Sequence, residues 1–271
     1  MTTSPRALPL PSGVSIPVLG LGVYQARAGR ETRDAVLAAF ELGYRHVDTA
    51  SLYGNEKEVG EAVRACGLPR EALFITTKLW NADHGYEEAL DAFARSHKKL
   101  GLAQVDLFLI HYPAPARRES WRALRKLKAD GLCRAIGVSN YEPRHIDEIL
   151  DAEPPAVNQV ELSPFLQQRA LSAYCKKHGI VLEAYAPLTR GEKFNNPVIV
   201  SIAKRHGRTP AQVLLRWAVE QGHVVLPKSV HKERLAENAG IFDWSLDETD
   251  HAAMAKLDEG FRTCWDPTAE P

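Results

Sequence analysis

Four titratable side chains of this 271-residue chain, Asp48, Tyr53, Lys78 and His111, have the types that a proton-donating site requires. A tyrosine hydroxyl has a reference pKa near ~10, so at neutral pH it holds a proton that it can donate. A lysine ammonium about 4 Å away stabilises the ionised phenol by roughly 4 kcal/mol. We therefore expect Lys78 to lower the pKa of Tyr53. Asp48 would keep Lys78 charged, and His111 would donate a hydrogen bond to a substrate oxygen. Together they would protonate an oxygen on which negative charge develops.

Such a charge develops when a carbonyl group accepts a hydride, and no protein side chain carries hydride. The chemistry therefore requires a nicotinamide cofactor. Tyr185 is a candidate for stacking on the flat nicotinamide ring, and Ser139, Asn140 and Gln159 are candidates for hydrogen bonds to its carboxamide. A second interpretation is equally compatible with the sequence: Tyr185 is an aromatic residue in the core of the fold, which is predicted below to be a barrel.

A cluster of basic and hydroxyl side chains, Lys228, Ser229 and Arg234, follows a short apolar run near the end of the chain. The segment enters a predicted helix, where backbone N–H groups and the helix dipole favour a phosphate group. Lysine, serine and arginine side chains also suit a second phosphate. The alternative is that these charges belong to an ordinary solvated helix face.

Each of the four titratable residues taken alone has a simpler explanation, such as helix capping for Asp48. Catalysis therefore depends on elements that bring the four together. Eight short apolar runs rich in Val, Ile and Leu predict parallel strands buried on both faces. They lie at 19–23, 44–47, 73–77, 105–110, 135–138, 157–160, 181–185 and 224–226. All four residues then lie at or just after the carboxyl ends of neighbouring strands.

Amphipathic segments between these runs predict helices, for example at 59–66 before Gly67, at 86–97, from Pro143 and from Thr209-Pro210. Strands that alternate with helices predict a (β/α)8 TIM barrel, in which catalytic groups lie at the carboxyl ends of the strands. A doubly wound sheet is the alternative, but Gln25 stands where its Gly-x-Gly-x-x-Gly turn requires the third glycine. Residues 1–14 are rich in turn formers and predict a β-hairpin that closes the barrel bottom.

Composition narrows the class of protein. Lys plus Arg and Asp plus Glu are 34 each, so the zero net charge predicts binding neither to nucleic acid nor to anionic membranes. No apolar run approaches the roughly 20 residues of a membrane span, and no secretory signal is recognisable. The four cysteines are scattered, which predicts reduced thiols, no metal site and a cytoplasmic protein. The length suits one domain over residues 1–271.

Several stretches resemble the aldo-keto reductase family, in the same order along the whole chain. They are 43–50, 53–56, 100–102, 105–107, 109–111, 137–140, 226–230, 234–235 and 237–238. The resemblance implies NADPH-dependent reduction of aldehydes, ketones or dicarbonyls, with Tyr53 as the general acid. It also implies that the cofactor contacts Ser139, Asn140, Gln159, Tyr185, Ala186, Leu188, Lys228, Ser229, Val230, Arg234, Glu237 and Asn238.

The short segment after His111, which we expect to end at a helix from Ser120, and the short tail after Gly260 resemble the bacterial type of the family, such as 2,5-diketo-D-gluconate reductase-like members. The candidate walls of the substrate pocket are Tyr24, Trp80, Phe165 and Trp265. Small carbonyl compounds are the expected partners, and a monomer with no obligate protein partner is the family expectation. The alternatives are an NADPH-binding structural or regulatory protein of this fold and an unrelated barrel isomerase.

Overall fold

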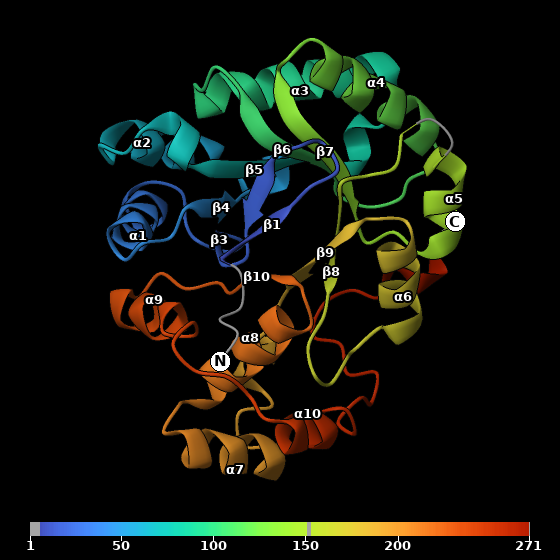
Figure 1. The fold of residues 1–271 in the computed structure, drawn as a ribbon. Coiled ribbons are helices and arrows are strands. Elements are labelled where there is room, and N and C mark those ends of the chain that lie inside the picture. The colour runs from blue at the N-terminus through green and yellow to red at the C-terminus, as the bar shows by residue number, and fades with distance from the viewer. Residues whose placement is uncertain (1–5, 151–152, 271) are drawn as a thin grey trace.

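A closed barrel of parallel strands forms the centre of the molecule in the computed structural model, which describes residues 6–150 and 153–270 (Figure 1). Within these residues the strands follow one another in chain order around one eight-stranded sheet. They are β3 (Gly20–Gly22), β4 (His46–Asp48), β5 (Phe74–Leu79), β6 (Val105–Ile110), β7 (Cys133–Ser139), β8 (Val157–Glu161), β9 (Val181–Tyr185) and β10 (Val224–Leu226). Bridges from Leu19 to Val225 and from Gly22 to Lys228 join the last strand to the first.

The predicted (β/α)8 TIM barrel is therefore confirmed. Sequential strand order excludes the doubly wound alternative, whose order reverses at a switch point. All eight apolar runs became strands because both faces of each strand are covered, which requires apolar residues without the alternation of a half-exposed sheet.

Helices surround the strands (Figure 1). They are α1 (Arg30–Glu41), α2 (Glu56–Ala65), α3 (Tyr86–Leu100), α4 (Arg117–Ala129), α5 (Pro143–Leu150), α6 (Arg169–Lys177), α7 (Pro197–His206), α8 (Pro210–Glu220), α9 (Lys232–Ala239) and α10 (Glu248–Met254). The expected helix after His111 begins at Arg117, three residues before Ser120, because the N–H of Ser120 already bonds to the carbonyl of Ala116. None of the helices in the described residues is long and apolar enough to cross a membrane.

Local sequence signals fix two of these helix ends as predicted. Thr209 caps α8: its hydroxyl accepts a bond from the Gln212 N–H, and the Gln212 side chain accepts one from the Thr209 N–H. Pro210 occupies the first turn, where its missing N–H costs nothing. Beyond α2, Gly67 adopts a φ of 72°, a left-handed conformation that ends the helix.

The predicted amino-terminal hairpin is also present. β1 (Ala7–Pro9) pairs in antiparallel fashion with β2 (Ser15–Pro17), and residues 1–5 of the expected segment lie outside the described residues. Leu10 and Ile16 of this hairpin pack in a buried cluster with Phe74 and Val157, the first residues of β5 and β8. The hairpin thus closes the amino-terminal end of the barrel and leaves the carboxyl end of the strands for a site.

Candidate active site

Lys78 is the centre of a buried polar cluster at the carboxyl end of the barrel. Its Nζ donates hydrogen bonds to Asp48 Oδ1 at 2.6 Å, to the Thr49 carbonyl at 2.9 Å and to Tyr53 Oη at 3.3 Å. Asp48 is the last residue of β4 and Lys78 lies in β5, so the parallel pairing of these strands brings the two together. The structure therefore joins the three expected residues in one chain of contacts.

Tyr53 reaches this cluster from a short 3₁₀ turn, η1 (Ser51–Tyr53), that follows β4. The Ser51 hydroxyl donates to the Lys78 carbonyl at 3.0 Å, which ties the turn to β5. Gly54 then takes a φ of 70°, which a residue with a side chain rarely adopts, and the chain continues into α2. The turn thus fixes the Tyr53 hydroxyl over the Lys78 ammonium.

The pKa of Tyr53 lies well above its ordinary value, mainly because the phenol is buried and secondarily because Asp48 lies close by. This corrects the expectation that Lys78 lowers it. The main reason is that burial disfavours the ionised phenol, and the Asp48 carboxylate, which pairs with Lys78 at 2.6 Å, adds a negative charge close to it. Tyr53 consequently keeps its proton throughout the neutral pH range.

His111 lies beside Tyr53, and the centroids of the two rings are 5.7 Å apart in an edge-to-face arrangement. Trp80 and Tyr112 contact the His111 ring as well, with centroids 5.3 Å away in both cases. Burial lowers the pKa of His111 well below its usual value, and the nearby Lys78 charge acts in the same direction. At neutral pH the ring is uncharged, so it can donate one hydrogen bond but is a poor source of a proton.

The side chains expected around a nicotinamide form a hydrogen-bonded row across three strands. The Tyr185 hydroxyl donates to Asn140 Oδ1 at 2.8 Å, Asn140 Nδ2 donates to the His111 carbonyl at 3.0 Å, and the Ser139 hydroxyl donates to the Gln159 carbonyl at 2.8 Å. These bonds hold the Tyr185 ring at the edge of a cavity, half-buried, so its interpretation as a barrel-core residue does not hold. Gln159 lies deeper, and its Nε2 donates to Asp48 Oδ2 at 2.8 Å.

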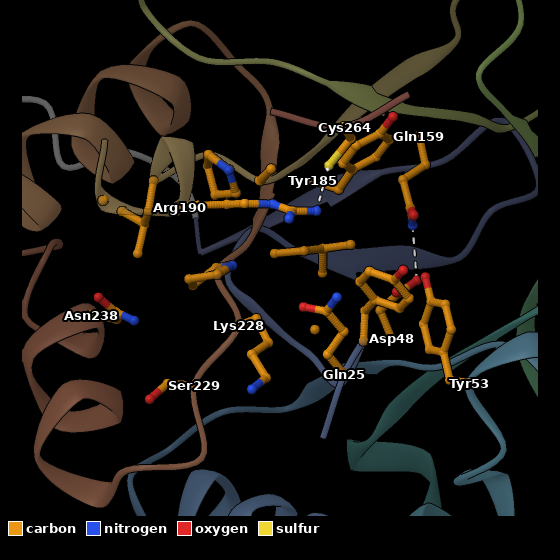
Figure 2. A pocket seen from close by; sticks show the side chains of 18 of the residues that line it. Gln25, Asp48, Tyr53, Gln159, Tyr185, Arg190, Lys228, Ser229, Asn238 and Cys264 are labelled. Atoms are coloured by element: carbon orange, nitrogen blue, oxygen red, sulfur yellow. Dashed lines mark hydrogen bonds between the residues drawn. The ribbon is translucent and has the colours of Figure 1, made fainter. Parts of the chain in front are cut away.

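One elongated cavity of about 720 Å³ connects this cluster to α9. Figure 2 shows Ser229 and Asn238 towards one end of the cavity and Tyr53 with Gln159 towards the other. The predicted residues that line it are Tyr24, Asp48, Tyr53, His111, Ser139, Asn140, Gln159, Tyr185, Ala186, Leu188, Lys228, Ser229, Arg234, Glu237, Asn238 and Trp265.

Four predicted site residues do not line the cavity. Lys78 lies fully buried beneath it, and Trp80 lies behind His111. Val230 lies outside the lining, between Ser229 and α9. Phe165 is only 1% exposed and belongs to the hydrophobic core, so the structure does not bring it to the pocket wall. Its backbone carbonyl instead accepts a bond from the Phe261 N–H at the start of the tail.

Positive charge is available at the α9 end of the cavity. Lys228 and Arg234 are exposed, and in the described residues neither side chain forms an ion pair or hydrogen bond. The Ser229 hydroxyl accepts a bond from the His231 N–H at 3.1 Å just before α9 begins. Glu237 differs from its neighbours, since its carboxylate accepts a bond from the Thr209 hydroxyl. This end of the cavity can therefore bind an anion.

Sequence reasoning missed Arg190 and Cys264, two lining residues whose side chains meet at the cavity (Figure 2). The Arg190 guanidinium donates to the Cys264 thiol at 3.4 Å. Arg190 lies in the 3₁₀ turn η4 (Thr189–Gly191), and it, Thr189 and Ala186 all have φ between 47° and 52°. Left-handed backbone at three such residues is costly and clusters at functional sites. Only the folded structure reveals it, because none of the three is glycine.

A buried acid, Glu161 at the end of β8, holds the tail that carries Cys264 and Trp265. Its carboxylate accepts bonds from the Thr263 N–H and hydroxyl, both at 2.6 Å, and from the Cys264 N–H at 3.3 Å. A glutamate in or directly after an apolar run was the available signal for this role, and Glu161 directly follows the run at 157–160. The same signal marks Glu183 in β9, which is fully buried and accepts a bond from Gln159 Nε2 at 2.7 Å.

Comparison with known proteins gives consistent matches over almost the whole chain. Residues 18–259 match the family model described as Aldo/keto reductase family. Glyoxal reductase of Bacillus subtilis is 48% identical over 92% of this chain and 90% of its own, and 9,11-endoperoxide prostaglandin H2 reductase of Trypanosoma cruzi is 45% identical over 98% and 96%. A crystal structure of a Gox0644 mutant in complex with NADPH superposes with a TM-score of 0.92 at 41% identity over 98% of both chains.

Proposed function

The chain belongs to the aldo/keto reductase family of NAD(P)-dependent oxidoreductases, and from this premise we propose that it reduces aldehydes, ketones or dicarbonyls to alcohols with NADPH. One observation carries the proposal: the hydrogen-bonded Asp48–Lys78–Tyr53 cluster lies at one end of a cavity whose other end presents Lys228 and Arg234, two cations without an ion pair in the part of the chain that the structure describes. A proton donor and an anion site within one cavity are what a reductase with a phosphorylated hydride donor needs.

The residues present fit such a cofactor. Tyr185 offers a ring at the cavity edge, and Ser139, Asn140 and Gln159 offer polar atoms beside it. Lys228, Ser229 and Arg234 offer two cations and a hydroxyl for the 2′-phosphate that distinguishes NADPH from NADH. Ala186, Leu188, Val230, Glu237 and Asn238 complete the proposed contacts. When bound, the nicotinamide supplies a hydride to the carbonyl carbon.

In the proposed mechanism Tyr53 donates its hydroxyl proton to the carbonyl oxygen as negative charge develops there. The high pKa of Tyr53 keeps the phenol protonated until that charge appears. Lys78 then stabilises the phenolate through the contact that its Nζ already makes, and Asp48 keeps the ammonium charged and oriented. His111, uncharged, orients the carbonyl with a hydrogen bond and excludes water with its aromatic neighbours.

Substrate class follows from the walls around the cluster. Tyr24 and Trp265 line the cavity and are 45% and 51% exposed, so the mouth of the pocket is aromatic and open to solvent. Such a mouth suits small and varied carbonyl compounds, and the similarity to glyoxal reductase supports dicarbonyls among them. The expected cytoplasmic location and monomeric state stay predictions.

Two assays test the proposal. NADPH oxidation in the presence of methylglyoxal or nitrobenzaldehyde supports the reductase, whereas tight NADPH binding without any turnover of such carbonyls supports the structural or regulatory alternative. Failure to bind NADPH at all would contradict both. Family membership already removes the unrelated barrel isomerase.

A further inference from the structure

Behind the Asp48–Lys78–Tyr53 cluster lies a second buried carboxyl group, that of Glu183 in β9. It is fully buried, and its Oε2 accepts a hydrogen bond from Gln159 Nε2 at 2.7 Å. The same Nε2 donates to Asp48 Oδ2 at 2.8 Å. One neutral amide group therefore bridges the two carboxyl groups, and the charge of Glu183 acts directly on Asp48.

The other oxygen of Glu183, Oε1, accepts no hydrogen bond from the described residues. It faces His46 Nε2 at 3.6 Å. His46 Nδ1 lies 3.4 Å from the Pro17 carbonyl, which can only accept, so Nδ1 carries the hydrogen. In an uncharged ring Nε2 is then an acceptor, and the Thr76 hydroxyl, 3.2 Å away, can donate to it. Nε2 is therefore already occupied, and an ionised Oε1 would be a buried charged oxygen that receives no donor from the described residues, so this site favours the protonated, uncharged form of Glu183.

A count of the buried charges leads to the same result. Lys78 and Asp48 form a pair of zero net charge, so an ionised Glu183 would add a negative charge that no further buried cation in this cluster offsets. A proton on His46 would offset it, but burial and the nearby Lys78 charge lower the pKa of His46 to about 3. Burial, together with Asp48, raises the pKa of Glu183 to about 8.

We propose that Glu183 is a positioning residue of the reductase, a neutral carboxylic acid that takes the second hydrogen bond of Gln159 while leaving Asp48 as the single anion of the cluster. The inference rests on the function proposed above, because its effect is on proton donation by Tyr53. With Glu183 neutral, the Lys78–Asp48 pair stays balanced beneath the phenol. Glu183 touches neither the cavity nor Tyr53, so it acts through Gln159 and Asp48.

Ionisation of Glu183 has a defined consequence. A second negative charge beside Asp48 holds the Tyr53 proton more tightly and opposes its transfer to substrate. Among the described residues, the titratable groups that act on Glu183 are His46 and Asp48 from β4 and Lys78 from β5, while β8 contributes the neutral Gln159. Proton donation should therefore weaken as the pH rises through about 8, the pKa of Glu183.

The substitution Glu183→Gln separates this role from simple packing, because glutamine reproduces the shape and hydrogen bonding of the protonated acid. Its carbonyl can accept from Gln159, and its uncharged amide nitrogen takes the place of the oxygen that faces His46. Single-turnover hydride transfer in the variant should stay within about threefold of the parent near pH 6.5. Between about pH 7 and pH 9 the parent rate should fall by up to about tenfold in total, whereas the variant should change much less.

Thermal unfolding gives a readout that does not depend on activity. The pKa of Glu183 is higher in the folded protein than its ordinary value, so the folded state retains a proton that the unfolded chain has released. The stabilising contribution is complete at low pH and is lost as the pH rises from about 4.5 to about 8. The Tm of the parent should fall over this interval by several degrees more than the Tm of the Glu183→Gln variant.

Asp106→Asn is a matched control. Asp106 in β6 is also fully buried, but it pairs with Arg70 and with Arg134 in β7, away from the cavity. Its loss should lower the Tm while leaving the pH profile of hydride transfer like that of the parent. A further measurement on the parent itself is infrared titration, in which a C=O band of a protonated carboxylic acid should disappear near pH 8 and be absent from the Glu183→Gln variant.

The outcomes separate the two proposals. A Glu183→Gln variant with the pH profile and Tm profile of the parent, or one that loses more than about tenfold in rate near pH 6.5, would overturn the role of Glu183. A parent protein that binds NADPH but reduces no carbonyl compound would overturn the proposed function. In that case the infrared and Tm measurements still decide whether Glu183 is protonated.

Discussion

Single side chains account for the expected choice of cofactor. Arg234 is an exposed cation without an ion pair in the described residues, and it lines the same cavity as Lys228 and Ser229. If it binds the 2′-phosphate, Arg234→Ala should weaken NADPH binding by roughly ten- to a hundredfold, since a charge-assisted hydrogen bond contributes about 1.5–3 kcal/mol. NADH binding should change little. Fluorescence titration with both cofactors measures the difference.

Lys232→Ala provides the control for this experiment. Lys232 lies two residues away on the same helix, but it pairs with Glu41 at 2.7 Å and does not line the cavity. Its removal should leave the affinity for both cofactors nearly unchanged. Equal weakening of NADPH and NADH by Arg234→Ala would show that Arg234 does not recognise the phosphate.

At this scale the sequence predicted which residues meet but not how their charges combine. Asp48, Tyr53 and Lys78 meet as expected, because parallel neighbouring strands must bring their carboxyl ends to one edge. The pKa of Tyr53 is raised, whereas the sequence predicted that it is lowered. It depends on burial and on the pairing of Lys78 with Asp48, and both are properties of the folded state. The role of Glu183 was not predicted for the same reason, because it depends on burial and contacts that exist only in the folded state.

At the scale of elements, the tail over the pocket depends on one carboxylate. Glu161 at the end of β8 accepts three hydrogen bonds from Thr263 and Cys264, and Trp265 follows directly. Glu161→Gln should lose the charge-assisted strength of these bonds and loosen the tail. We expect KM for carbonyl substrates to rise by about three- to tenfold at nearly constant kcat, since uniform binding is lost. Steady-state kinetics measures this.

NADPH affinity is the internal control for Glu161→Gln, because in the described residues the Glu161 carboxylate forms its hydrogen bonds with Thr263 and Cys264 and with none of the residues proposed to hold the cofactor. A loss of kcat equal to the rise in KM would instead indicate that Glu161 affects the reacting groups. Stability should decrease slightly, as Glu161 becomes a weaker acceptor for the Thr263 N–H.

The strands were more predictable than the loops for a physical reason. A strand buried on both faces requires a continuous apolar run, and such runs are visible in the sequence. The turn with Ala186, Thr189 and Arg190 has left-handed backbone that its residue types disfavour, so only tertiary contacts impose it. Phe165 was expected at the pocket and lies in the core for a related reason, since the path of its loop decides which way it faces.

At the scale of the whole molecule, the barrel leaves one cavity with an open aromatic mouth. Tyr24 and Trp265 are about half exposed there, so few contacts surround a bound substrate. We predict that small aldehydes and dicarbonyls are reduced with modest affinity and that steroids are reduced poorly. A panel of carbonyl substrates, compared by kcat/KM, checks this. Tight and exclusive use of one large ketone would show a pocket that closes around its substrate.

The central claim is that Tyr53 gives the proton, and single-turnover hydride transfer in Tyr53→Phe with saturating NADPH tests it most directly. The substitution removes one oxygen and keeps the ring that packs edge-to-face against His111. General acid catalysis is worth about 10²–10⁴-fold, so the rate should fall at least about a hundredfold while NADPH affinity stays nearly unchanged. A rate within about threefold of the parent would mean that another group, such as His111, donates the proton, and would contradict the account.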